Sequence, residues 1–178
     1  MAETESFFWT HFTDTYIELA KTRARSETDP AGRGSAVAAL RLGLKVLLRL
    51  FAPFQPHVTE EVLSWAYAEE TAQPSIHRAP WPSETDFEAV AAPDHELSFE
   101  IATTCWGAIN KRKADEKVSM GREVVRLGVA ANAGTLARLE VVREDVMAGA
   151  RVHEHRVEER AGLEDGVFEI VDIEFAER

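Results

Sequence analysis

The chain has 178 residues, of which 45% are hydrophobic and 29% are charged, so it can form a packed core and is not a disordered tail. It contains no apolar run of the roughly 18 residues that a membrane span needs, and its acidic first residues do not resemble a secretory signal. Its single cysteine, Cys105, excludes an internal disulfide and fits the reducing cytoplasm.

The net charge of −11 is distributed unevenly along the chain. Residues 1 to 59 carry seven basic and six acidic side chains, which gives +1, whereas residues 60 to 178 carry 13 basic and 25 acidic ones, which gives −12. A nucleic-acid site would therefore need local clusters of cations within a repelling overall field, and its affinity would fall with salt.

The first predicted element is a helix over residues 4 to 25, because Phe8, Phe12, Tyr16 and Ala20 recur every four residues. Basic side chains gather in its last turns, and aromatic side chains lie a few turns before them. Such a combination suits RNA, since cations bind phosphates and aromatic rings stack on bases. An ordinary solvated helix end is the alternative. The candidate contacts are Trp9, Tyr16, Lys21, Arg23 and Arg25.

Residues 26 to 34 are predicted to form a loop, and Ser35 is predicted to cap a second helix that ends near Phe51. The spacing of its leucines indicates a buried seam, and three basic residues four apart should form a solvent-facing strip. Two prolines then separate this second helix from a third helix, residues 57 to 68. The strip consists of Arg41, Lys45 and Arg49, and the inward side chains of the third helix are expected to be Val58, Val62, Trp65 and Ala66.

Residues 69 to 93 are predicted to form an ordered connector with Ile76, Trp81 and Phe87 as apolar anchors, so that Trp65 and Trp81 both belong to the core. Asp94 is expected to cap a long helix that reaches Lys117. Its basic end supplies three further candidate RNA contacts, Lys111, Arg112 and Lys113, for which a plain solvated helix end is an equally good interpretation.

The last third of the chain changes character. A strand is predicted at residues 124 to 130, a helix around residues 136 to 146, and strands at residues 151 to 159 and 166 to 175 joined as a hairpin through Asp165-Gly166. The predicted fold is mainly α, with a helical bundle in residues 1 to 93 followed by a long helix and a small α+β subdomain in residues 94 to 178.

Signatures of catalysis are missing from the sequence, which has no glycine-rich phosphate loop, nucleophile elbow or zinc-ligand set. Three weaker candidates have simpler interpretations. His153 and His155 are expected to be surface histidines, His57 near Glu60 and Glu61 a helix-start histidine, and Cys105 a core cysteine. We therefore predict no catalytic residue, metal ligand or cofactor in this chain.

Three stretches together resemble the anticodon-binding region of class I aminoacyl-tRNA synthetases for valine, isoleucine and leucine. They are residues 7 to 23 (FFWTHFTDTYIELAKTR), 47 to 62 (LLRLFAPFQPHVTEEV) and 75 to 82 (SIHRAPWP). The TEE and SIH strings in the last two favour the valyl branch. The passage 109 to 120 is similar to the basic end of the bundle in some of these enzymes.

The resemblance implies a helical bundle that holds the anticodon stem and loop of valine tRNA isoacceptors. The two ATP-binding signatures of the family are missing, so ATP and Mg²⁺ would belong to the parent enzyme, whose catalytic and editing domains are the expected partners. We expect an excised piece of a synthetase. The alternative is a truncated paralogue that acts as a protein-interaction or regulatory module without RNA binding. The net charge of −12 over residues 60 to 178 favours this alternative.

Overall fold

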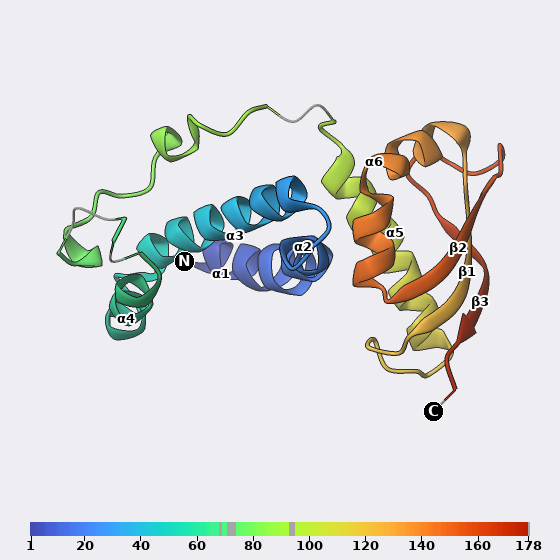
Figure 1. Cartoon of the computed structure of the whole chain (residues 1–178), viewed down its shortest axis with the longest axis horizontal. Helices are drawn as coiled ribbons and strands as arrows, with labels where there is room; N and C mark the ends of the chain where they lie inside the picture. Colours follow the sequence, from blue (N-terminus) through green and yellow to red (C-terminus); the bar gives the residue numbers. More distant parts are fainter. Residues whose placement is uncertain (68, 71–73, 93–94, 178) are drawn as a thin grey trace. The chain divides into compact units, whose positions relative to one another are not determined.

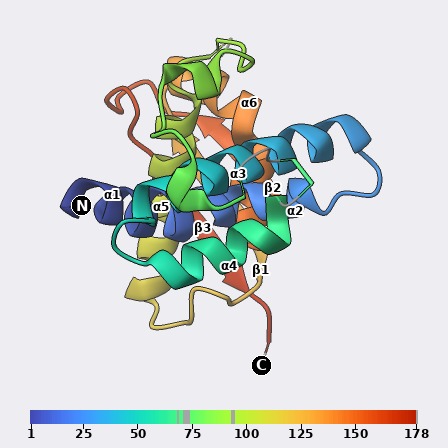
Figure 2. The same ribbon diagram turned by 90° about the vertical axis from the view of Figure 1, so that its left-hand side faces the viewer.

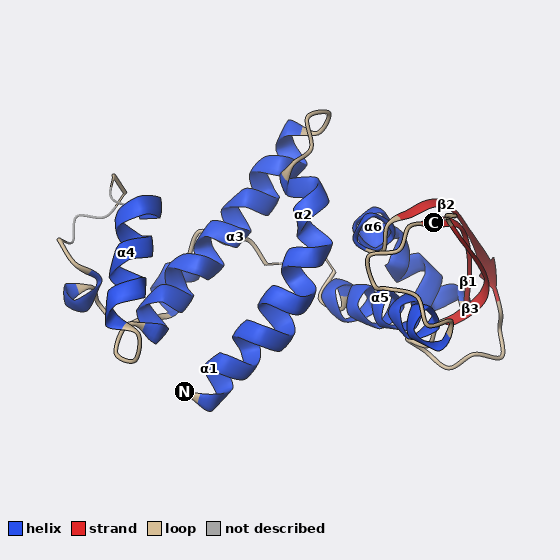
Figure 3. Cartoon of the chain, turned by 90° about the horizontal axis from the view of Figure 1, so that it is seen from below, coloured by secondary structure: helices blue, strands red, loops and turns tan. Residues whose placement is uncertain are grey.

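The computed structural model describes residues 1–67, 69–70, 74–92 and 95–177, and these form two compact units. The first consists of Met1–Ile17 and Ser26–Ala92, and the second of Glu18–Arg25 and the described residues from 95 onward. The predicted domain boundary, 93/94, and the predicted cap Asp94 lie outside the described residues. In the described parts of the chain all strands belong to the second unit (Figure 3). No helix there is long and apolar enough to cross a membrane.

The chain begins with α1 (Ala2–Ser6) and a π-helix, η1 (Phe7–Ile17), where one α-helix was predicted; α2 (Glu18–Ala24) follows in the second unit. A π-helix brings residues five apart into contact. Accordingly, the ring of Phe7 stacks on that of Phe12 at 6.4 Å, and the Thr15 hydroxyl donates to the Thr10 carbonyl at 2.8 Å. The helical prediction is confirmed, but the wider winding was not foreseen.

Helix α3 (Pro30–Phe51) begins before Ser35, so the predicted cap is wrong. The Asp29 carboxylate accepts a hydrogen bond from the Gly32 amide, and Pro30 occupies the first turn, where its missing N–H costs nothing. Near the middle of α3, Gly43 lies against Phe12. A Cβ atom there would approach Phe12 Cε2 to 2.6 Å, so only glycine permits this approach of η1 and α3.

Helix α4 (Pro56–Tyr67) lies beside α3 (Figure 2) and buries Thr59, Leu63 and Tyr67. Of the predicted inward side chains, Val62 and Ala66 are partly buried against this core, but Val58 is half exposed and Trp65 is 74% exposed, so the prediction is wrong for these two. The buried face is polar in part, and its hydroxyls are satisfied. Thr59 donates to the Gln55 carbonyl at 2.8 Å, and Tyr67 donates to the Arg41 carbonyl at 2.6 Å. Such hydrogen bonds remove most of the cost of burying these groups.

The connector contains two short 3₁₀ helices, η2 (Ile76–Arg78) and η3 (Glu84–Phe87). Ile76 is buried as predicted, but Trp81 and Phe87 are exposed, so they are neither anchors nor core. An ion pair holds η3 instead: Arg49, only 9% exposed, contacts Asp86 at 2.6 Å. This arginine and its guanidinium-to-carboxylate bond hold the pKa of Asp86 below its usual range.

The basic strip on α3 is thus only partly solvent-facing: the Arg49 side chain is buried, whereas 42% of the Arg41 side chain is exposed and Lys45 is partly buried. Besides Arg49, Arg41 donates to the Ala66 carbonyl at 2.9 Å, pairs with Glu70 and stacks its guanidinium 4.7 Å from the centre of the Tyr67 ring. Through these contacts, the two arginines of the strip join α3 to the chain that follows it.

The second unit contains α5 (Ser98–Asp115), β1 (Val124–Ala131), α6 (Ala133–Gly149), β2 (Val152–Glu159) and β3 (Glu169–Phe175). Helices α5 and α6 lie on one side of the sheet (Figure 1), and α2 packs against α6. The core includes Leu19, Cys105, Ile109 and Leu127, all at most 5% exposed. The coarse fold prediction, mainly α with a small α+β part, is confirmed.

The sheet order is β2-β1-β3, with β2 parallel and β3 antiparallel to β1. The predicted hairpin between β2 and β3 is therefore wrong. Gly166 does adopt a left-handed turn conformation, with φ of 76°, but the segment crosses to the far edge of β1. Strand β1 takes the central position because it is the most apolar of the three, with Leu127, Val129 and Ala131 fully buried.

Candidate RNA-binding surface

The predicted cations of the first cluster lie on α2 and directly after it, and the structure gives them different environments. Lys21 pairs with Glu18 on its own helix. Arg23 contacts Asp145 of α6 at 2.8 Å, and burial raises the pKa of that carboxyl. Arg25 is exposed and makes no ion pair with any described residue. Of the three, Arg25 is the cation most available to a phosphate, while Arg23 helps to hold α2 against α6.

The second predicted cluster forms the end of α5. Lys111 and Arg112 are both exposed, and Arg112 pairs with Glu116 at 2.9 Å, one helical turn later. Together with Asp115 and Glu169, these two cations line a hollow of about 200 Å³ that also contains Phe168. Two cations balance two carboxylates, so the hollow is close to neutral. Its two cations can meet phosphates, whereas the hollow as a whole does not select an anion.

Lys113 is fully buried, which removes it from the accessible cations. Its Nζ donates to three main-chain carbonyl oxygens, those of Met120 at 3.0 Å, Arg122 at 2.9 Å and Ala150 at 2.7 Å. Burial, assisted by the charge of Arg151, lowers the pKa of Lys113 to about 8. The ammonium ion is therefore present at neutral pH, and its three donors all serve the junction of α5, β1 and α6.

The two predicted aromatic contacts belong to the first unit, whereas the cations above belong to the second. Tyr16 is half-buried and stacks on Phe12, with ring centres 6.1 Å apart. Trp9 is 56% exposed and makes an edge contact with Phe8 at 4.9 Å. The structure thus shows Trp9 in an apolar environment, without a lysine or arginine among the side chains that share its pocket.

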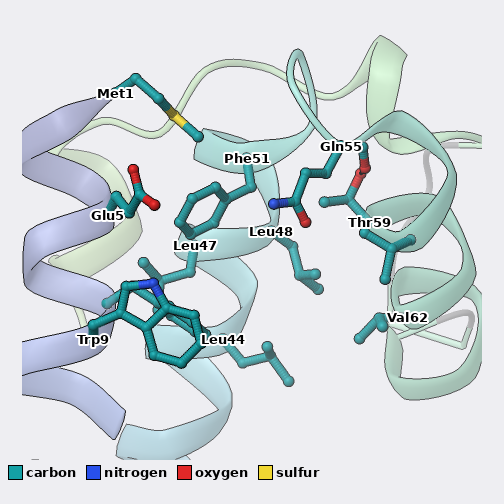
Figure 4. A pocket seen from close by; sticks show the side chains of 12 residues that line it. Met1, Glu5, Trp9, Leu44, Leu47, Leu48, Phe51, Gln55, Thr59 and Val62 are labelled. Atoms are coloured by element: carbon teal, nitrogen blue, oxygen red, sulfur yellow. Dashed lines mark hydrogen bonds between the residues drawn. The ribbon is translucent and has the colours of Figure 1, made fainter. Parts of the chain in front are cut away.

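That pocket, which we call the apolar groove, has a volume of about 250 Å³ and lies between α1–η1, α3 and α4 (Figure 4). Its lining is mainly apolar, and the acid Glu5 stands at one side. The sequence did not identify it, because its members come from three separate segments. They are Met1, Glu5, Phe8, Trp9, Leu44, Leu47, Leu48, Phe51, Gln55, Val58, Thr59 and Val62.

The weaker chemical candidates find no support as reactive sites. Cys105 is fully buried, and burial raises the pKa of its thiol to about 12, so the reactive thiolate is suppressed. His153 is exposed, 3.3 Å from a carboxylate oxygen of Glu123. Among the described residues, no three potential ligands are grouped so that they could hold a metal ion, and His153 with His155 makes no such group.

The chain matches the family described as anticodon-binding domain of tRNA ligase over residues 1–128. The chain belongs to this family. The match takes in the described first unit and reaches through α5 into β1. The region after β1, with α6, β2 and β3, lies outside this match.

The chain is also similar to enzymes named valine–tRNA ligase, among them those of the following three organisms. That of Salinispora tropica is 39% identical over 165 residues, and that of Thermobifida fusca is 41% identical over 154; each alignment covers 85% of this chain. That of Leifsonia xyli subsp. xyli is 36% identical over 168 residues, or 94% of the chain. The chain spans less than a fifth of these relatives, 18%, 16% and 18%. The predicted resemblance to the valyl-tRNA synthetase anticodon-binding region is confirmed.

Two of the strings that carried this resemblance are in contact in the folded domain. The Glu60 carboxylate of the TEE string accepts hydrogen bonds from the Ser75 hydroxyl at 3.0 Å and from the Ile76 amide at 2.9 Å. His77 Nε2 lies 3.3 Å from the Pro56 carbonyl oxygen. Glu60 thus fastens the connector to α4, and the two strings form one structural feature of this anticodon-binding domain.

Proposed function

We propose that this chain binds the anticodon stem and loop of a tRNA and that valine isoacceptors are its cognate RNAs. The observation that carries the proposal is the family match over residues 1–128. The helices of the first unit would form the bundle of such a module. We place the chain in a longer, cytoplasmic protein, in which a catalytic domain would use ATP and Mg²⁺ to attach valine to the tRNA that this module positions and an editing domain would be a further partner.

Within this proposal, the phosphate contacts are Lys21, Arg25, Lys111 and Arg112. Arg25 and Lys111 are exposed cations without an ion pair among the described residues, so binding RNA costs them no existing contact. Lys21 and Arg112 pair with carboxylates of their own helix, and surface pairs of this kind are worth at most about 1 kcal/mol, so a phosphate can compete for them. Lys113 and Arg23 are left out because each serves a contact inside the second unit.

The acidic balance sets the expected affinity. Each neutralised phosphate contributes about −0.7 to −0.9 to the slope of log K against log salt, so four phosphate contacts give a slope of about −3. The remainder of the surface repels RNA, so binding should be modest at physiological salt. Tyr16, half-buried on its helix, is proposed as a stacking side chain only for a base that reaches its exposed edge. Trp9 is not included, since no lysine or arginine lines its pocket.

A fluorescence titration of the whole chain with valine tRNA tests the proposal. We expect tighter binding than to a valine tRNA with a replaced anticodon, and a decline with salt of the slope above. Arg25→Gln and Lys111→Gln should each weaken binding and lower the slope by about one. The matched control is Arg126→Gln, an exposed arginine on the sheet face away from the helices. Absence of binding at any salt would refute RNA recognition and favour the module without RNA binding, whereas binding without an anticodon preference would refute valine isoacceptors as the cognate RNAs.

A further inference from the structure

Helices α5 and α6 of the second unit both end at a cation in a strained backbone conformation. Lys117 follows the end of α5 with φ of 56°, and Arg151 follows the end of α6 with φ of 58°. This left-handed position after a helix is normally occupied by glycine, because a Cβ atom is crowded there. Among the described residues, these two are the non-glycine residues with positive φ. Strain that is kept for two long cations directs attention to what their side chains bind.

The helix dipole accounts for only part of this arrangement. A cation near the C-terminal end of a helix is stabilising, but it can lie in the last turn without any backbone strain. Helix α5 already has Arg112 and Lys113 in its last turn, so its dipole does not require Lys117. Helix α6 has no basic residue in its last turn, and there Arg151 also serves the dipole.

The buried ammonium of Lys113 gathers the segments that carry these cations. It binds carbonyl oxygens of the turn after α5 and of Ala150, which fixes that turn beside the end of α6. Arg151 Nη1 donates to the Gly121 carbonyl in the same turn at 3.2 Å, so its guanidinium lies next to the residue that precedes Arg122. Cations from two separate segments therefore meet on one well-ordered surface.

This surface carries a local excess of positive charge. Residues 111 to 123 hold five basic and three acidic side chains, and Arg151 brings the sum to +3, so the remainder of the chain, with its total of −11, holds −14. Two of the three carboxylates are engaged elsewhere, Glu116 with Arg112 and Glu123 near His153. Besides burial, the charge of Arg151 helps to lower the pKa of Lys113, as expected where positive charge is not neutralised nearby.

The two arginines retain donors for an incoming anion. Arg151 uses one guanidinium nitrogen on the Gly121 carbonyl, and Arg122 uses one on the Ala176 carbonyl at 3.3 Å. Neither these arginines nor Lys117 makes an ion pair with a described residue, so binding an anion breaks no such pair. The remaining N–H groups of a guanidinium form a planar fork that matches the oxygens of a phosphate.

We propose that Lys117, Arg122 and Arg151, which we call the basic turn cluster, bind phosphates of the RNA backbone. The inference rests on the proposed binding of tRNA and adds three contacts to the four phosphate contacts named for it. Because phosphates are alike in every nucleotide, the basic turn cluster strengthens binding without reading the anticodon.

The test titrates the whole chain with fluorescent valine tRNA, and with the same tRNA carrying a replaced anticodon, at several salt concentrations. Seven phosphate contacts predict a slope of log K against log salt of about −5 to −6, and the triple variant Lys117→Gln, Arg122→Gln, Arg151→Gln should return it to about −3. The triple variant should weaken both RNAs by the same factor, about tenfold or more, and keep the ratio between them. The control Arg126→Gln removes an equal charge from the outer face of the sheet and should leave the slope unchanged.

Lys117→Gly separates a binding role from a structural one. Glycine relieves the strained backbone, so this variant should raise the midpoint of urea unfolding and yet weaken tRNA binding as much as Lys117→Gln does. A slope of about −3 that the triple variant leaves unchanged would overturn the basic turn cluster while the anticodon preference upholds the proposed function. Absence of tRNA binding at any salt would overturn both. An oligoglutamate peptide that binds as tightly as an oligouridylate of equal length would overturn RNA as the ligand, in favour of an acidic protein segment.

Discussion

Replacing Gly43 by alanine should destabilise the first unit, although the same change in a helix usually stabilises it. Removing a helical glycine gains up to about 1 kcal/mol from intrinsic propensity. At this position the new Cβ would lie 2.6 Å from Phe12 Cε2 and 3.0 Å from Cζ, whereas ordinary van der Waals contacts begin at 3.4 Å. Phe12 is only 9% exposed, so its ring has little room to move.

The magnitude follows from the two opposing effects. Overpacking a well-packed site costs about 1–3 kcal/mol, which exceeds the gain from helix propensity, so Gly43→Ala should lower the free energy of unfolding by about 1 kcal/mol. Gly34 is the matched control, because it lies on the same helix and a Cβ atom added there would meet nothing within 4 Å. Gly34→Ala should raise the free energy of unfolding by about 0.5–1 kcal/mol.

Urea unfolding followed by circular dichroism at 222 nm measures both variants, with equal slopes required for the comparison. The double variant Phe12→Leu, Gly43→Ala isolates the clash, since it should be less destabilised than the sum of the two single variants by about 1 kcal/mol. If Gly43→Ala stabilises the chain as much as Gly34→Ala does, the close approach of η1 and α3 is refuted.

Three further predictions concern buried polar groups. Lys113→Met leaves three carbonyl oxygens without their donor and should cost about 3 kcal/mol in urea unfolding, whereas Lys111→Met should stay within about 0.5 kcal/mol; equal effects would contradict the burial of Lys113. Because Arg49 lowers the folded pKa of Asp86, this pair contributes stability above the unfolded value of 3.8, and that contribution is lost as the pH falls through the folded pKa. Asp86→Asn should abolish this part of the acid dependence of the melting temperature, and an unchanged dependence would refute it. Cys105 should react with a thiol reagent only after unfolding, and rapid labelling of the native chain would show that its buried, protonated state is wrong.

The presence of helices could be predicted from the sequence, because apolar side chains at helical spacing form a stripe that a helix can bury against its neighbours. The details that failed depend on partners distant in the chain. Val58 and Trp65 satisfy the apolar period of α4 as well as Leu63 does, yet the helix turns Thr59 and Tyr67 inward. The reason is that main-chain carbonyls on α3 and before α4 accept their hydroxyls, which no periodicity of α4 itself can indicate.

The predicted pairing of β2 with β3 was wrong for a related reason. The Asp165-Gly166 turn is a strong local hairpin signal, and Gly166 does adopt the left-handed conformation. The local turn signal competes with pairing to a distant strand. Strand β1 is buried on its helix-facing side and offers two free edges. Once α6 returns the chain to place β2 parallel on one edge, β3 satisfies its own hydrogen bonds at the other edge, with Ile173 opposite Leu127.

For the candidate RNA contacts at the end of α5, the helical spacing to buried residues indicates which of the cations is buried, whereas their charge does not. Lys113 follows the buried Ile109 by four positions and the buried Cys105 by eight, so helical geometry puts it on the core stripe, while Lys111 and Arg112 point elsewhere. A lysine at a core position must find acceptors, and the carbonyls of Met120, Arg122 and Ala150 supply them. The basic run therefore divides into a structural cation and two surface cations. The proposed phosphate surface at this end of α5 is correspondingly small, so the proposal predicts that binding of RNA responds to single substitutions at Lys111.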